Sequence, residues 1–129
     1  MRKLACAVMA CGLFTTSLAV AGETGVNAQG YITCWSYADA HSPKVYYSAV
    51  FEGDGTMMEG AKAAFAQMLG SRYGFHDGVY CNLAYKRSTS VQKLMADHKV
   101  NTQSFRSQGT TVVETGWTYN GARAIGGAR

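Results

Sequence analysis

Apolar and polar residues alternate over four stretches of this chain, and a period of two predicts β-strands. The first two stretches, residues 31–38 and 44–52, are rich in aromatic and β-branched side chains and are separated by a turn at Pro43. Residues 79–85 and 110–119 repeat the pattern later in the chain. The short first connection predicts an antiparallel hairpin. One face of its second strand is expected to carry Val45, Tyr47, Ala49 and Phe51.

Apolar residues spaced by three and four predict two helices between these strands. The first is expected over residues 57–71, with Thr56 as its N-terminal cap. The second is expected to begin at Ser88 or Ser90 and to run to about Ser107.

The order of these elements is ββαβαβ, which predicts an α+β fold. We expect a two-layer sandwich in which two helices cover one face of a mainly antiparallel, four-stranded sheet. The single α+β domain is expected over residues 30–119, with a flexible lead-in over 22–29 and a flexible C-terminal tail over 120–129.

The first 21 residues have the three parts of a cleavable signal peptide. Arg2 and Lys3 supply a positive start, and residues 4–20 contain no acidic or basic side chain. The small residues of Ala19-Val20-Ala21 then match the positions that signal peptidase recognises. The chain is therefore expected to be exported, to the periplasm or outside the cell, by a bacterium.

Two other interpretations of this segment remain open. The stretch could stay in the membrane as an anchor, although Gly12 and residues 15–17 dilute its apolar character. Cys11 follows a poor version of the sequence that precedes an acylated cysteine in bacterial lipoproteins. Contact with the membrane is expected only through this segment, and only if it is not removed.

Removal of the signal segment changes the charge of the chain. The formal net charge of the full sequence is +4, and loss of two basic residues lowers it to about +2. The remaining basic residues are scattered, so no nucleic-acid partner is expected. His41, His76 and His98 lack the spacing of a metal site, and no cofactor motif is present.

The same cleavage leaves Cys34 and Cys81 as the two cysteines of the mature chain. Each falls among residues expected to face the core, on the first and third predicted strands. In an oxidising compartment such a pair most simply forms a disulfide. The alternatives are two free buried thiols or a catalytic cysteine, but neither residue has a histidine close in sequence to act as a base.

The second half of the chain resembles a group of small, uncharacterised exported bacterial domains. These domains end in a segment of the form Gly-x-x-Val-Val-x-Thr-Gly-Trp, which matches residues 109–117. The resemblance covers about half of the mature chain and carries no catalytic motif. It implies a bacterial origin and supports the fold, but it implies no activity.

Two local patterns resemble catalytic motifs. Ser90 and Lys93 have the Ser-x-x-Lys spacing of penicillin-recognising enzymes, but the other motifs of that class are missing. The simpler interpretation is a serine cap followed by an exposed lysine. His76 and Asp77 are adjacent and could supply acid–base chemistry. A small hydrolase or transferase that uses His76, Asp77 and Ser90 is therefore one alternative function.

Eight tyrosines and two tryptophans exceed what a small core needs. If the helices cover the face with Ile32 and Cys34, the remaining aromatic side chains point outward, where they suit a protein, glycan or peptide partner. Stabilisation of the sheet by cross-strand pairs and a homodimer interface are the alternatives. The candidate binding face consists of Tyr31, Trp35, Tyr37, Tyr46 and Tyr80.

The absence of a coherent catalytic set beside this aromatic face favours a non-enzymatic binding module. Its expected partner is another molecule of the envelope, and inhibition or immunity against an envelope protein is one role that fits. A purely structural envelope protein is a further alternative.

Overall fold

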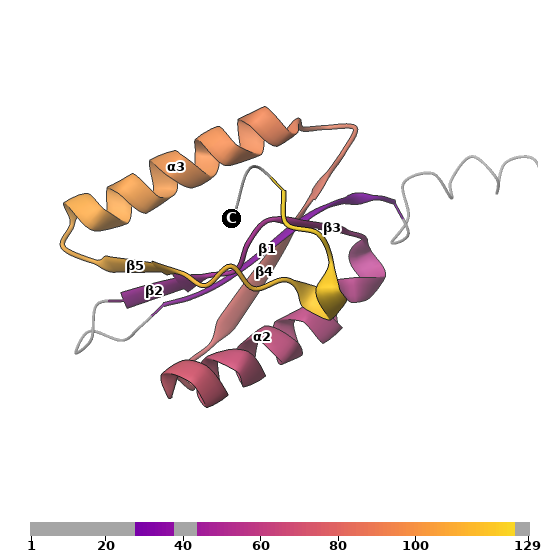
Figure 1. Ribbon diagram of the computed structural model, residues 1–129. Helices are drawn as coiled ribbons and strands as arrows, with labels where there is room; N and C mark the ends of the chain where they lie inside the picture. The colour runs from indigo at the N-terminus through magenta and orange to yellow at the C-terminus, as the bar shows by residue number, and fades with distance from the viewer. Residues whose placement is uncertain (1–27, 38–43, 126–129) are drawn as a thin grey trace, which may run out of the picture.

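The computed structural model describes residues 28–37 and 44–125. Strands and helices follow one another in the order shown in Figure 1. The strands are β1 (Gly30–Tyr37), β2 (Lys44–Tyr47), β3 (Phe51–Gly53), β4 (Val79–Tyr85) and β5 (Thr111–Glu114). The helices are α2 (Met58–Tyr73) and α3 (Val91–Ser107), with short 3-10 turns η3 (Gly55–Met57) and η4 (Tyr119–Gly121).

Several sequence predictions fall outside the described residues. These are the signal segment 1–21, the acylation of Cys11, most of the lead-in and the last four residues of the tail. Among the helices that the structure describes, none is long and apolar enough to cross a membrane. Contacts continue past η4, where Ala124 forms a bridge with Phe51 of β3.

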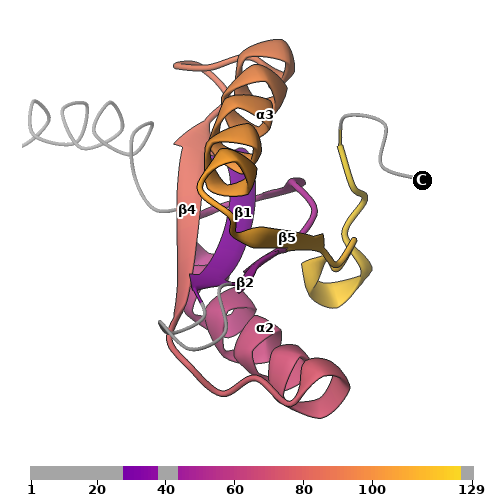
Figure 2. The ribbon, with the colours of Figure 1, turned by 90° about the vertical axis from the view of Figure 1, so that its left-hand side faces the viewer.

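The strands form one mixed sheet with β1 at its centre. Strand β4 pairs with one edge of β1, while β2 and β3 pair with successive parts of the other edge, all antiparallel. Strand β5 pairs with β2 and runs parallel to it. The predicted α+β class is confirmed, but the predicted four-stranded, mainly antiparallel sheet is only partly correct. Figure 2 shows the steep twist of β2 and β5 relative to β1 and β4.

The predicted strand over residues 44–52 divides into β2 and β3. Tyr47 lies opposite Trp35, whereas Phe51 lies opposite Ile32, so four steps along this segment match three steps along β1. One extra residue is therefore accommodated here, as in a β-bulge. Because of the extra residue, Tyr47 and Phe51 point to opposite faces of the sheet. The prediction that they share one face is therefore wrong.

Ser48 holds this bulge in place. Its hydroxyl accepts a hydrogen bond from the backbone N–H of Cys34 at 2.8 Å and donates one to the carbonyl of Ala49 at 2.7 Å. The backbone N–H of Ser48 also donates to the carbonyl of Cys34, at 2.9 Å. Ser48 is buried, so its side chain replaces the backbone acceptor that a regular ladder would offer.

Helix α2 forms the dry core of the protein with one face of the sheet. Ala61, Phe65 and Leu69 recur at helical spacing and are fully buried. They pack against Ile32, Cys34, Phe51 and Val79. Trp117, beyond β5, covers the open side of this core, with its ring centroid 5.2 Å from that of Phe65.

Helix α3 lies on the opposite face, so the prediction that both helices cover one face is wrong. Figure 1 shows the two helices on either side of the strands. The chain passes through α2 from β3 to β4 across β1, and then returns through α3 from β4 to β5. Each helix thus connects two parallel strands. Connections of this kind are almost always right-handed. Since α2 and α3 lead in opposite directions across the sheet, they lie on opposite faces of it.

Local capping decides where the helices begin and end. Asp54 precedes η3 and accepts a hydrogen bond from the backbone N–H of Thr56, so Asp54 provides the cap that the sequence assigned to Thr56. Ser90 caps α3 as predicted, because its hydroxyl accepts from the backbone N–H of Lys93 at 3.1 Å. Helix α2 ends at Gly74, whose φ of 66° is left-handed.

The predicted disulfide between Cys34 and Cys81 is confirmed. The two residues lie directly opposite each other on β1 and β4, with their side chains on the face that α2 covers. The bond closes a loop with a sequence separation of 47 residues, which contains β2, β3 and α2. It therefore joins the two ends of the segment that forms the dry core.

We expect loss of this disulfide to destabilise the fold by about 4 kcal/mol, because the unfolded chain regains the entropy of that loop. The double variant Cys34→Ala with Cys81→Ala should unfold at lower urea concentration than the wild-type chain. Dithiothreitol should lower the wild-type midpoint similarly and leave the double variant unchanged. Equal midpoints for oxidised wild type and double variant would contradict this prediction.

Ser48→Ala should destabilise the protein by about 1–3 kcal/mol, because the buried N–H of Cys34 loses its acceptor. The same measurement of urea unfolding applies. Ser71→Ala is the matched control, since its exposed hydroxyl bonds only to the carbonyl of Met68 within α2. If both variants change the free energy of unfolding equally, Ser48 has no special role at the bulge.

Candidate functional site

Aromatic side chains cover the face of β1 and β4 that points away from α2. Trp35 and Tyr80 are cross-strand neighbours, with ring centroids 6.0 Å apart and planes only 27° from parallel. The ring of Tyr37 meets that of Tyr80 edge-on, also at 6.0 Å. Tyr37 and Tyr80 remain about half exposed. Together these three residues form a continuous surface, here called the aromatic platform.

The structure separates the other two aromatic residues of the predicted face from this platform. Tyr31 lies on the same face of β1 but farther along the strand, where the ammonium of Lys86 sits 5.7 Å from its ring centroid. Tyr46 points to the α2 face and is buried against Tyr73 and Phe75. Tyr46 therefore does not belong to the candidate binding face.

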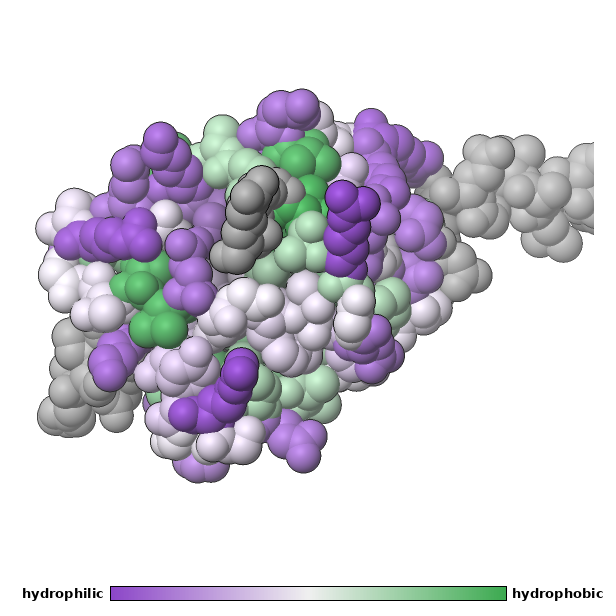
Figure 3. Space-filling view, viewed as in Figure 1, coloured by the Kyte–Doolittle hydropathy of each residue, from purple (hydrophilic) through white to green (hydrophobic). Residues whose placement is uncertain are grey.

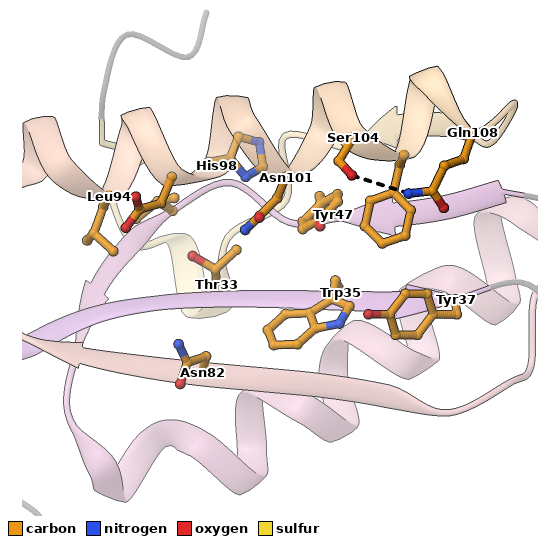
Figure 4. A pocket seen from close by; sticks show the side chains of 13 residues that line it. Thr33, Trp35, Tyr37, Tyr47, Asn82, Leu94, His98, Asn101, Ser104 and Gln108 are labelled. Atoms are coloured by element: carbon orange, nitrogen blue, oxygen red, sulfur yellow. Dashed lines mark hydrogen bonds between the residues drawn. The ribbon is translucent and has the colours of Figure 1, made fainter.

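Helix α3 crosses over the platform and leaves a pocket of about 500 Å³ between itself and the sheet. Figure 4 shows side chains of β1, β4 and α3 directed into this space. The sheet contributes Thr33, Trp35, Tyr37, Tyr47, Val50 and Asn82. Helix α3 and the turn after it contribute Leu94, Asp97, His98, Asn101, Ser104, Phe105 and Gln108.

The packing of α3 on the sheet is incomplete around this pocket. Thr102 is the one buried residue of the helix, while Val100 is largely exposed. Phe105 reaches the platform, with its ring centroid 5.7 Å from that of Tyr37. In contrast to α2, α3 thus leaves room for another molecule against the sheet.

Uncharged polar groups form part of the helix side of the pocket. Asn101, Ser104 and Gln108 come from one side of α3, and Nε2 of Gln108 donates to the hydroxyl of Ser104 at 3.3 Å. Asn82 enters from β4. The sequence analysis missed these residues because it followed only the apolar stripe of the helix. Their spacing of three and four beside that stripe was the signal.

The two ionisable groups that α3 places at the pocket already have partners. Asp97 receives a hydrogen bond from Nζ of Lys93 at 2.8 Å. Nε2 of His98 lies 2.6 Å from Oε1 of Glu114 on β5. The ring of His98 also packs edge-on against Tyr47, at 4.9 Å between centroids. Through these two contacts, His98 joins α3 to both β2 and β5.

Burial raises the pKa of Tyr47 above its ordinary value of 10.0, and the nearby Tyr37 and Glu114 raise it further. Burial disfavours the phenolate, and negative charge on the two neighbours does the same. Tyr47 is therefore a neutral wall residue of the pocket at physiological pH.

The residues of the alternative catalytic set do not come together. His76 and Asp77 precede β4, whereas Ser90 follows it, so the length of a seven-residue strand, roughly 20 Å, lies between them. Figure 1 shows the two loops at opposite ends of β4. The hydroxyl of Ser90 caps α3, and Lys93 pairs with Asp97. The Ser-x-x-Lys pattern is thus a helix cap followed by an exposed lysine.

Across residues 28–37 and 44–125, no three His, Cys, Asp or Glu side chains gather closely enough to hold a metal ion. His41, the remaining histidine of the sequence analysis, lies outside the described residues.

Tyr47→Phe should make stability less sensitive to alkali. The raised pKa means that the contribution of the neutral phenol is complete below pH 10 and is lost as the pH rises through the folded value. Urea unfolding between about pH 9 and 11 should therefore show a shallower fall for the variant than for wild type. Tyr85→Phe, which removes an exposed phenol, is the control; identical slopes for Tyr47→Phe and wild type would refute the assignment.

Comparison with known proteins does not place the chain in a family. No family model matches the sequence, and searches of curated proteins and of solved structures find no significant match. The resemblance of residues 109–117 to exported bacterial domains stays a prediction. The pocket and the aromatic platform are therefore the features of the described chain that bear on its function.

Proposed function

We propose that this chain is an exported, non-enzymatic binding module whose ligand occupies the pocket between α3 and the aromatic platform. The disulfide fits a location outside the cytoplasm. The predicted signal segment 1–21 refines that location to the periplasm or the cell exterior of a bacterium. The observation that carries the proposal is a pocket floored by aromatic rings and walled by amide and hydroxyl groups.

The size and lining of the pocket support binding of a small molecule or of part of a larger one. Small-molecule sites generally measure about 300–1,000 Å³ and combine apolar surface with a few polar groups. The pocket falls within this range. Tyr37 and Tyr80 continue the aromatic platform into solvent. A ligand with an extended chain would therefore find further contact surface outside the pocket.

The described residues support binding more than catalysis. Asp97 and His98 are engaged by Lys93 and Glu114, and no nucleophile with an adjacent base faces the pocket. The alternative set of His76, Asp77 and Ser90 is divided between the two ends of β4. The two acid–base groups of the lining are thus already bonded to other side chains of the fold.

A broad protein interface has weaker support on the face shown in Figure 3. Hydrophobic residues there form small patches separated by hydrophilic ones. Partner binding by inhibition or immunity proteins more often uses a wide surface with a hydrophobic centre. Inhibition of another envelope protein, homodimerisation and a structural role remain predictions, and each would involve a surface other than the pocket alone.

Blocking the pocket tests the proposal. Ser104→Trp places a large ring in the cavity, whereas Gln103→Trp places the same ring on an exposed position one residue away. A panel of a neutral disaccharide, adenosine and a dipeptide is titrated into the ¹⁵N-labelled chain, followed by amide chemical shifts. At least one compound should perturb Trp35 and Asn101, and Ser104→Trp alone should abolish the effect.

Two results would contradict the proposal. If no panel compound perturbs the pocket, or if binding survives Ser104→Trp as fully as Gln103→Trp, the pocket is not a ligand site. Circular dichroism of both variants shows whether the fold is intact. Sedimentation of the wild-type chain would reveal the homodimer that one alternative predicts.

A further inference from the structure

We infer that the ligand of the pocket is a neutral saccharide, with a sugar ring stacked on Trp35 and its hydroxyl groups bonded to Asn82 and Asn101. This inference rests on the proposed function, because it names the chemical class that the same pocket would take. Three independent properties of the lining support it: its charge, the arrangement of its aromatic rings and the chemistry of its amides.

The charge of the lining favours an uncharged ligand. Asp97 and His98 are the ionisable side chains of the pocket apart from its tyrosines, and each has a partner of its own on the protein. No arginine or lysine of the described chain lines the pocket to receive a phosphate or carboxylate. Bringing a charged group into such a site without a counter-charge is unfavourable.

Most of the aromatic rings that line the pocket lie on its sheet side. The sheet contributes Trp35, Tyr37 and Tyr47, whereas α3 contributes Phe105. Asn101, Ser104 and Gln108, from α3 and the turn after it, lie on the opposite side of the pocket. A sugar ring presents an apolar C–H face and a polar rim, which this asymmetry matches. A nucleobase has two flat apolar faces and would leave one of them against amides.

The amides match hydroxyl groups in their hydrogen-bonding chemistry. A carboxamide carries both donors and an acceptor, and a sugar hydroxyl likewise donates and accepts. Within the described chain, the side chains of Asn82 and Asn101 form no hydrogen bond to protein, so both keep their full capacity for a ligand. They enter from β4 and α3, on different sides of Trp35, and so can hold a ring laid on the platform.

The exposed part of the platform favours a chain of sugars over a single one. Tyr37 lines the pocket and is 47% exposed, and Tyr80, whose ring contacts those of Trp35 and Tyr37, is 52% exposed. A second sugar residue could rest on them while the first occupies the cavity. The envelope glycans that an exported bacterial protein would meet have this extended form.

Isothermal titration of the purified chain with N,N′-diacetylchitobiose and with cellobiose, both neutral, tests the inference. Either disaccharide should bind, and Trp35→Ala and Asn101→Ala should each weaken that binding at least about tenfold. Trp35→Phe should retain part of it, because an aromatic face remains. Tyr85→Ala is the matched control, since Tyr85 lies exposed on the same strand as Tyr80 but on the other face.

Adenosine, a dipeptide and glucuronic acid are titrated in parallel. Binding of adenosine or the dipeptide at the pocket without binding of either disaccharide overturns the saccharide assignment and leaves the proposed function standing. Failure of every compound, or binding that Ser104→Trp does not affect, overturns both. If glucuronic acid binds as tightly as the neutral sugars, the inference that the ligand is uncharged is wrong. If Trp35→Ala does not fold, Asn101→Ala, which changes an exposed residue of α3 that lines the pocket, decides the outcome.

Discussion

Seven consecutive residue pairs join β1 to β4, and the disulfide between Cys34 and Cys81 lies within them. A covalent bond between directly opposite residues permits a single register for these strands. Side chains alternate between the two faces, so a slip by one residue would exchange the core face and the pocket face. The dry core under α2 and the stacking of Trp35 on Tyr80 both depend on this pairing.

Both faces of the sheet depend on the pairing of β1 with β4, but the two helices cover them differently. Under α2, Phe65 and Leu69 fill the space against Ile32, and Trp117 covers the remaining opening. Under α3, Leu94 and Phe105 meet the sheet beside polar side chains such as Asn101 and Ser104, and a cavity remains. The first face supplies most of the buried apolar surface, and hence stability. A ligand bound in the pocket, as proposed, would therefore leave the core under α2 intact.

The sequence predicted some parts of the site well and others poorly. The period of two along β1 and β4 placed Trp35, Tyr37 and Tyr80 on one face of the sheet, and the pairing of these strands has them there. Tyr46 was assigned to the wrong face of the sheet. The alternation of residues within the strand after Pro43 was the only guide to which side of that strand faces the core. The amides of α3 were missed because the sequence does not show which side of a half-polar helix will face a sheet.

Sequence alone determined the properties that depend on neighbouring residues. These include the α+β class, the extent of α2 and α3 within a few residues, the cap at Ser90 and the chemical plausibility of the disulfide. Tertiary structure decided which face each helix covers, because the handedness of a crossover depends on the order of strands in the sheet. It also decided the bulge at Ser48 and the pocket, since both arise from residues that meet only after distant strands have paired.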